Sequence, residues 1–228
     1  MVYEIAGLKV GMEPKFARLT KQCEAYRSWG EPVLTVTPTP GQLTRPWMRH
    51  YTPEDREYIC CSAAFCQQIV EHGRFFLHAS AVVMEGEAYL FSAPSGTGKS
   101  THTALWRKLF PQSYILNDDK PVIWPTEEGI TAWGTPFSGK SDLQVNRGVP
   151  LRGICFLKQA EENRICPISG AGALAMLLNN TWRPGSSRSM ERLLDMVEQV
   201  MAEIPLYEMA CTREPQAARM ACAVMKGT

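Results

Sequence analysis

The distribution of apolar residues divides the chain into short segments that predict both strands and helices. Near the N-terminus, a β-branched run over Glu31–Pro38 lies between prolines and predicts a strand. The proline-rich stretch that follows it predicts irregular structure. We therefore expect residues 1–50 to form a small β-rich region and residues 51–228 to form one larger domain.

The larger domain is expected to begin with a helix. Thr52 is suited to cap this helix, Pro53 suits its first position, and Gly73 is suited to end it. Between them, apolar side chains recur every three or four residues, at Ile59, Ala63, Cys66 and Val70. This spacing predicts that one face of the helix packs against a core.

Two strands and a tight turn are expected next. Residues 75–84 and 88–92 are strongly apolar, and residues 85–87 between them suit a turn. A loop then leads into a helix that is expected to begin near Lys99 and to end before Pro111. The apolar run "YIL" that follows predicts a buried strand with acidic residues at its end.

The rest of the chain alternates between strand patterns and helix patterns. The segment "GITAW" predicts a strand, and "GICFLK" and "RICPIS" predict a hairpin joined by "QAEEN". Helices are expected over residues 171–178, 190–202 and 215–225. This alternation predicts a mixed α/β fold.

The segment "SAPSGTGKST" lies between an expected strand and an expected helix, the setting that a phosphate-binding loop needs. Gly96 and Gly98 allow backbone N–H groups to converge on an anion at the start of the helix. Lys99 supplies a positive charge to the phosphates, and Ser100 supplies a hydroxyl to Mg²⁺. The chemistry of these residues predicts that the segment binds the phosphates of a nucleotide.

This loop departs from the usual G-x-x-x-x-G-K-[ST] pattern at its first positions. Ala93 replaces the first glycine, and Pro94 fixes one backbone angle and removes one N–H donor. Both residues lie where the loop leaves its strand, so neither change removes a group that faces the phosphates. We expect the loop to bind phosphate in spite of them.

Two acids follow the loop at a spacing that suits the metal side of a nucleotide site. Asp118 and Asp119 lie 19 and 20 residues after Lys99, at the end of the apolar strand. Adjacent side chains at a strand end point in different directions, so the pair can divide two roles. One acid can hold a metal ion while the other accepts a proton from a nucleophile.

Composition excludes several classes of function. The formal net charge is +1, which gives no reason to expect nucleic acid or an anionic membrane as a partner. No apolar run reaches the roughly 18 residues of a spanning helix, and no signal-peptide pattern opens the chain. Eight cysteines occur without any C-x-x-C pair, which favours reduced thiols. We expect a cytoplasmic protein.

The stretch from Phe75 to Asp119, which contains "LHASAVVMEGEAYLFSAPSGTGKSTHTALW" and "YILNDD", resembles the catalytic domain of HPr serine kinase/phosphorylase. That family shares its nucleotide fold with phosphoenolpyruvate carboxykinase. The resemblance implies a P-loop α/β fold with a mixed sheet over residues 51–228, with ATP and Mg²⁺ as cofactors.

The resemblance also implies roles for individual residues. Asp118 would act as the base toward an acceptor hydroxyl, and His78, 21 residues before Lys99, would lie near the transferred phosphoryl group. Ser100 and Asp119 would hold the metal. The nucleotide phosphates would be bound by Ser95, Gly96, Thr97, Gly98, Lys99, Ser100 and Thr101.

A second glycine-rich segment, "GTPFSGKSDLQVNRG", is a further candidate for binding phosphate. A transferred phosphoryl group needs more positive charge than one lysine offers, and Lys140 and then Arg147 are the first candidates to supply it. Arg183 is a weaker candidate. The alternative is a solvated surface loop with ordinary basic residues.

The function that these features predict is an ATP-dependent kinase acting on a hydroxyl, with serine of a peptide or small protein as the expected acceptor. The chain lacks the downstream E-x-R-G-x-G signature of bacterial HPr kinases, so neither HPr as the acceptor nor phosphorylase activity follows. A small-molecule hydroxyl kinase, a carboxykinase-like enzyme and a nucleotide-dependent binding module remain alternatives. The sequence leaves homo-oligomer formation open.

Overall fold

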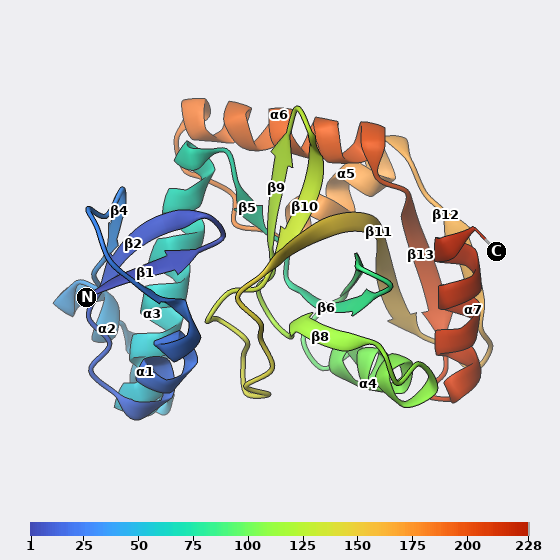
Figure 1. Cartoon of the computed structure of the whole chain (residues 1–228), viewed down its shortest axis with the longest axis horizontal. Helices are drawn as coiled ribbons and strands as arrows, with labels where there is room; N and C mark the ends of the chain where they lie inside the picture. Colours follow the sequence, from blue (N-terminus) through green and yellow to red (C-terminus); the bar gives the residue numbers. More distant parts are fainter. Residues whose placement is uncertain (228) are drawn as a thin grey trace.

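A computed structural model describes residues 1–227 and shows a mixed α/β protein with two sheets. The smaller sheet has four strands in the order β3-β1-β2-β4, and it lies beside helices α1 and α3 (Figure 1). Its elements are β1 (Val2–Ile5), β2 (Leu8–Met12), α1 (Ala17–Cys23), η1 (Glu24–Tyr26), β3 (Arg27–Ser28), β4 (Leu34–Val36), α2 (Pro40–Leu43), η2 (Pro46–His50), α3 (Pro53–Gln68) and η3 (Ile69–His72).

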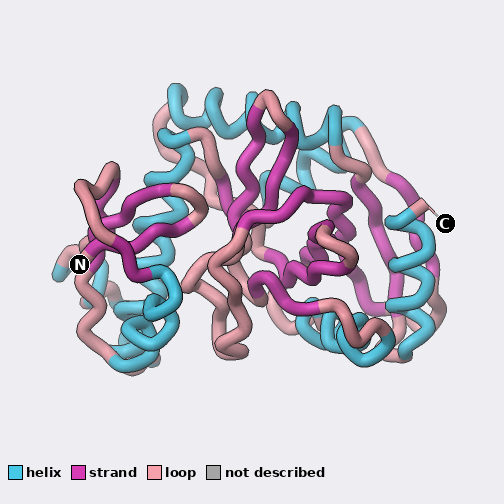
Figure 2. Tube along the Cα trace, in the orientation of Figure 1, coloured by secondary structure: helices cyan, strands magenta, loops and turns pink. Residues whose placement is uncertain are grey.

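The larger sheet has nine strands and curls into a half-barrel (Figure 2). Its main path runs β5-β9-β10-β11-β7-β6-β8, and β13 joins β11 to β12 off this path. The elements are β5 (Phe75–Phe76), β6 (Ala79–Met84), β7 (Glu87–Ser92), α4 (Lys99–Leu109), β8 (Tyr114–Asn117), β9 (Val122–Thr126), β10 (Gly129–Trp133), β11 (Gly148–Gln159), β12 (Arg164–Pro167), α5 (Gly170–Asn179), α6 (Ser187–Glu203), β13 (Leu206–Cys211) and α7 (Pro215–Lys226).

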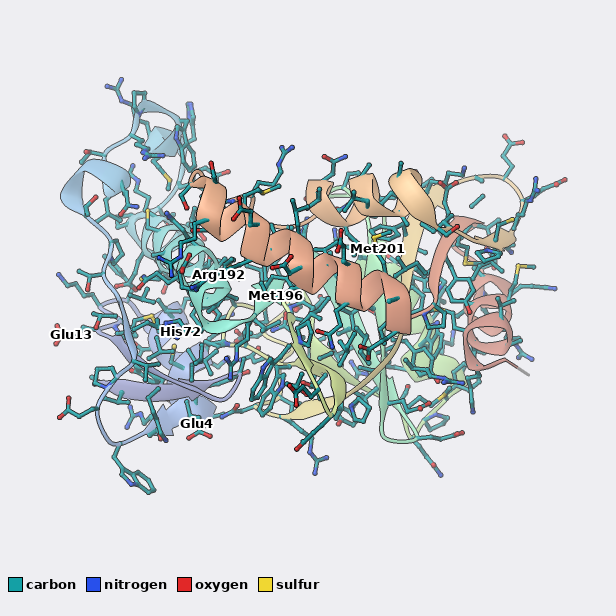
Figure 3. The ribbon with its side chains drawn as sticks, turned by 90° about the horizontal axis from the view of Figure 1, so that it is seen from above. Glu4, Glu13, His72, Arg192, Met196 and Met201 are labelled. Carbon is teal, nitrogen blue, oxygen red and sulfur yellow. The ribbon has the colours of Figure 1, made fainter. Side chains whose placement is uncertain are left out.

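Side chains of successive strand residues alternate between two buried layers. Along β6 and β7, Ala81 and Leu90 point into a core that α5 and α6 cover, whereas Val82 and Phe91 point into a core that α4 and α7 cover. Figure 1 shows α6 along one side of the sheet and α4 along the other. In Figure 3, α6 crosses the molecule and carries Met196, whose side chain is buried in the first core.

The helix expected after Thr52 is present, and its N-terminus has the expected cap. The Thr52 side chain accepts a hydrogen bond from the Asp55 N–H at 3.1 Å. Gly73 ends the following turn in the left-handed region, with φ 71°. The turn between β6 and β7 also needs left-handed backbone, and Glu85 (φ 53°) and Gly86 (φ 84°) supply it.

Two strand predictions were wrong, one in its continuity and one in its pairing. The single strand expected over residues 75–84 is interrupted, because the Leu77 and His78 N–H groups bond the carbonyls of Pro121 and Asn180 instead of a ladder partner. The expected hairpin of β11 and β12 is absent. Instead, β13 lies between them, parallel to β11 and antiparallel to β12.

Residues 1–50 are less uniformly extended than their pattern indicates, since α1 and the one-turn α2 interrupt them. Strand β4 lies within the β-branched run and pairs with β2 in parallel. The eight cysteines are free thiols, six of them buried. Over residues 1–227, no helix combines the length and the apolar character needed to cross a bilayer.

Candidate functional site

The glycine-rich loop lies where the sheet meets helix α4. Strand β7 ends at Ser92, and α4 begins at Lys99 with Gly98 as its N-cap at φ 115°. Gly96 also has a positive φ, 81°. Because left-handed backbone at both positions strongly favours glycine, the spacing of the two glycines is a requirement of this loop.

The start of α4 offers donors to an anion. Backbone N–H groups in the first turn of a helix have no carbonyl one turn earlier to bond, and here they belong to Lys99, Ser100 and Thr101. Ser100 and Thr101 are exposed at this end of the helix. The positive end of the helix dipole lies at the same place.

Lys99 is buried, and its ammonium folds back along the loop. Its Nζ donates to the Ala93 carbonyl at 2.8 Å and to the Pro94 carbonyl at 3.4 Å. Burial lowers the pKa of Lys99, and the charges of Asp119 and Asp118 act in the opposite direction. The two acids therefore favour the charged form of Lys99.

Asp118 is connected to α4 through a buried serine. The Ser80 hydroxyl donates to Asp118 Oδ1 at 2.5 Å and lies 2.8 Å from the Thr103 hydroxyl of α4. Strand β6 is antiparallel to both β7 and β8, so Ser80 near its start lies at the edge where β7 and β8 end. Thus one acid of the pair is held against the helix that follows the loop.

Asp119 has three polar neighbours from different elements. Its Oδ1 lies 3.4 Å from His78 Nε2, and its Oδ2 accepts from Lys120 at 2.6 Å and from the Tyr58 hydroxyl at 3.2 Å. Burial raises the pKa of Asp119, but the His78 hydrogen bond and the Lys120 charge outweigh it and hold that pKa below its usual range. Asp119 is therefore an ionised carboxylate held by Lys120, His78 and Tyr58.

Asn117 shapes the turn that presents the two acids. Its Oδ1 accepts from the N–H groups of Asp119 at 3.0 Å and Lys120 at 2.7 Å. Its amide nitrogen donates to the Thr135 carbonyl at 2.8 Å. Asn117 is fully buried, so its amide group is committed to this turn.

The second glycine-rich segment lies beside the acidic pair at one point. The Gly139 N–H donates to the Tyr58 hydroxyl at 2.7 Å, and a Cβ built on Gly139 would lie 3.3 Å from Asp119 Cβ. Arg18 of α1 holds the same residue by donating to the Gly139 carbonyl at 2.6 Å. Lys140 follows directly and is exposed.

The other basic candidates lie farther along the chain. Arg147 is exposed just before β11, where its carbonyl accepts from the Gly134 N–H. Arg183 is exposed in the connection between α5 and α6. Neither residue has a side-chain contact with the acidic pair among the hydrogen bonds and ion pairs of residues 1–227.

Sequence reasoning missed four polar residues that join the parts of this site: Tyr58, Ser80, Asn117 and Lys120. For Asn117 a signal was present, because asparagine before two acids at a strand end favours an Asx turn. The other three come from the interior of a helix, the interior of a strand and the residue after the acids. Nothing in their local sequence distinguishes them from core or surface residues.

The residues present fit a magnesium ion that is shared with a phosphate ligand. Within residues 1–227 no group of three His, Cys, Asp or Glu side chains could enclose a metal by itself. Mg²⁺ commonly takes one or two carboxylates and completes its shell with phosphate oxygens and water. Asp118, which Ser80 connects to Thr103 of α4, its neighbour Asp119 and the Ser100 hydroxyl at the start of α4 are oxygen ligands of that kind.

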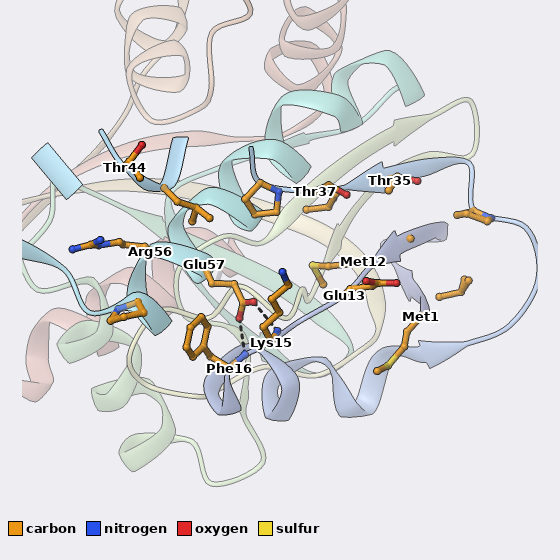
Figure 4. Close-up of a pocket in the computed structure, with 17 residues that line it drawn as sticks. Met1, Met12, Glu13, Lys15, Phe16, Thr35, Thr37, Thr44, Arg56 and Glu57 are labelled. Carbon is orange, nitrogen blue, oxygen red and sulfur yellow. Dashed lines mark hydrogen bonds between the residues drawn. The ribbon is translucent and has the colours of Figure 1, made fainter. Parts of the chain in front are cut away.

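Two hollows lie in or near these elements. A groove of about 480 Å³ runs along the outer side of the glycine-rich loop, and it is lined by Pro94, Ser95, Gly96, Thr97, Leu157, Lys158 and Gln159. A mostly apolar pocket of about 690 Å³ lies in the N-terminal region, where Glu57 accepts from the Lys15 and Phe16 N–H groups (Figure 4). This pocket includes neither the loop nor the acids.

Comparison with known proteins identifies the family. No match was found among curated proteins. The family model "SynChlorMet cassette protein ScmC" matches residues 57–214, more than two-thirds of the chain. The matched region begins within α3 and extends beyond β13, so it includes the glycine-rich loop, His78, the acidic pair and the second glycine-rich segment. The chain belongs to the ScmC family of SynChlorMet cassette proteins.

Proposed function

We propose that this protein is an ATP-dependent kinase that transfers the γ-phosphoryl group of Mg-ATP to a hydroxyl, with serine of a peptide or small protein as the acceptor. The proposal includes a P-loop fold of the HPr kinase and phosphoenolpyruvate carboxykinase type. The proposal rests on one observation. Ser80 holds Asp118 against α4, the helix that follows the glycine-rich loop, so the loop and the acidic pair lie together.

The loop and its lysine would bind and orient the phosphates. Backbone N–H groups from Gly96 to Ser100 would surround the phosphate oxygens, and the Lys99 ammonium would exchange its two carbonyl partners for those oxygens. Ser100 and Asp119 would hold Mg²⁺, which would supply further neutralisation of charge in the transition state. His78, whose Nε2 lies 3.4 Å from Asp119 Oδ1, would lie near the transferred phosphoryl group.

Asp118 would move the proton in the transfer step. A bond forms between the acceptor oxygen and the γ-phosphorus while the bond to the bridging oxygen of ADP breaks. The hydroxyl proton passes to the Asp118 carboxylate, and ADP leaves. Lys140, exposed next to Gly139, and then Arg147 are the residues proposed to add positive charge from the second glycine-rich segment.

Two substitutions with matched controls test this proposal. We expect Lys99→Ala to abolish transfer, whereas Lys108→Ala, exposed on the same helix, leaves it unchanged. We expect Asp118→Asn to slow transfer by about 10²–10⁴-fold while ATP still binds, and Asp195→Asn, exposed on α6, to have no effect. Transfer is measured with γ-labelled ATP and extract of the source cells, and mass spectrometry identifies the labelled species.

Each alternative predicts a different result in this assay. Full activity of Asp118→Asn would contradict the role of Asp118 as the base. Label on a metabolite instead of a polypeptide would replace the acceptor class with a small-molecule hydroxyl. ATP binding by calorimetry without any transfer would favour a nucleotide-dependent binding module.

A further inference from the structure

The groove beside the glycine-rich loop has two walls of different origin. One wall is the loop itself, Pro94–Thr97, and the other is the end of strand β11, Leu157–Gln159. Its volume of about 480 Å³ lies within the roughly 300–1,000 Å³ of small-molecule sites. The groove is therefore large enough for a ligand that continues outward from the loop.

The order of the strands places this groove opposite the acids. Along the sheet, β7 lies between β11 on one side and β6 with β8 on the other. The loop follows β7, and the acids follow β8 beside the start of β6. Because β11 is parallel to β7, its end reaches the same edge from the opposite side. The loop consequently separates the acids from the groove.

A nucleotide bound at the loop must follow this arrangement. Its reactive terminal phosphate has to lie on the side of Asp118, His78 and Asp119, because the transfer chemistry is there. The phosphate chain is linear, so the other end of the nucleotide leaves the loop on the side of β11. That end is the nucleoside, and the groove between the loop and the end of β11 is where it would lie.

The walls of the groove suit a nucleoside in their chemistry. Pro94 is exposed and contributes apolar surface on which a flat base can pack, whereas Leu157, which is buried, forms the inner limit of the groove. Gln159 is held beside the loop because its Nε2 donates to the Thr97 carbonyl at 3.0 Å. Lys158 forms an ion pair with Glu208, so charged groups also lie at the edge of the groove.

We propose that this groove holds the base and ribose of the nucleotide whose phosphates the glycine-rich loop binds. The inference rests on the proposed function, since it requires a nucleotide at the loop. It assigns recognition of the nucleoside to Lys158 and Gln159, which are exposed at the end of β11 and belong to no recognisable nucleotide motif in the sequence.

Comparison of two ligands separates the groove from the loop. ATP should use both, whereas tripolyphosphate should use the loop alone. We expect Gln159→Trp, which fills the groove, to weaken ATP at least tenfold and tripolyphosphate less than twofold, measured by calorimetry with Mg²⁺. Arg152→Trp is the matched control, because Arg152 is exposed on the same strand far from the groove. This control should leave both affinities unchanged.

The outcomes distinguish the inference from the function on which it rests. Unchanged ATP affinity in Gln159→Trp, or equal loss for both ligands, would overturn the groove as the nucleoside site while leaving the loop as a phosphate site. Failure of the unaltered protein to bind either ligand would overturn the proposed function, and the inference with it.

A photolabelling experiment on the unaltered protein gives a second measurement that does not depend on how a variant folds. The full chain is irradiated with 8-azido-ATP and Mg²⁺, and the modified peptide is identified by mass spectrometry. We expect the label within residues 94–97 or 157–159, and we expect excess ATP to remove it. Label confined to any other region overturns the inference.

Discussion

At the scale of single residues, the site depends on close backbone packing as well as on charged side chains. Gly134 opens the second glycine-rich segment, and a Cβ built on it would lie 1.9 Å from the Val145 carbonyl oxygen and 2.7 Å from the Leu116 carbonyl oxygen. Leu116 precedes the turn that carries Asp118 and Asp119. Absence of a side chain at Gly134 therefore allows the segment to approach the strand that presents the acids.

We expect Gly134→Ala to destabilise the protein strongly. Both neighbouring atoms belong to the backbone, so they cannot move aside as a flexible side chain would, and overpacking typically costs about 1–3 kcal/mol or more. Gly172→Ala is the control, because Gly172 lies in α5 with open space around it and alanine favours a helix by about 1 kcal/mol over glycine. Urea unfolding measures both. Equal stability of the two variants would contradict the close contact at Gly134.

At the scale of elements, much of the fold could be predicted from local patterns. Helix α3, the β6–β7 turn, α4, α5, α6 and α7 all lie where capping residues, turn residues or helical spacing indicated them. The loop and the acids were located because their motif requires a strand, a helix and a strand end in a fixed order.

The pairing of strands could not be predicted in the same way. The β11–β12 hairpin was expected because "QAEEN" is a suitable connection, yet β13, some 40 residues later in the chain, takes the position between them. Pairing between distant strands depends on which faces α4 and α7 can bury together with β13, and no local pattern contains that information. The contacts of Tyr58 and Ser80 with the acids were missed for the same reason.

Helix α3 is joined to the second glycine-rich segment through one hydroxyl. Tyr58 accepts from the Gly139 N–H and donates to Asp119, and Arg18 lies over its ring at 3.8 Å. Burial raises the pKa of Tyr58, and Asp119 raises it further, so the hydroxyl keeps its proton and can continue to donate. Tyr58 therefore links a helix, a loop and the acidic pair.

We expect Tyr58→Phe to loosen the segment around Gly139. The Gly139 N–H loses its acceptor in a partly buried position, which costs about 1–3 kcal/mol, and its hydrogen exchange should accelerate. Tyr26→Phe is the matched control: the Tyr26 hydroxyl is buried and has no hydrogen-bond partner in the described chain, so its removal should be neutral or stabilising. Hydrogen exchange with mass spectrometry follows residues 138–142. Unchanged exchange in Tyr58→Phe would show that the link does not hold the segment.

At the scale of the whole molecule, a third hydrophobic core joins the two sheets. Tyr3, Ile5 and Val10 of the small sheet are buried in the same cluster as Phe76 of β5 and Val122 of β9. Phe65 of α3 and Phe137 of the second glycine-rich segment belong to it as well. The N-terminal region thus covers apolar surface that the larger part of the chain cannot bury alone.

We expect residues 51–228 to fail to form a well-packed native state without residues 1–50. Burial of each large apolar side chain contributes about 1.5–3 kcal/mol, and exposure of Phe65, Phe76, Val122 and Phe137 together would cost an amount comparable to the whole stability of a typical domain, about 5–15 kcal/mol. The shortened chain should lose near-UV circular dichroism and bind ANS, whereas the full chain should unfold in one transition. Addition of a peptide of residues 1–50 should restore the near-UV signal. A shortened chain with the near-UV spectrum and thermal midpoint of the full protein would mean that the large sheet is stable by itself and that the N-terminal region is an independent attachment.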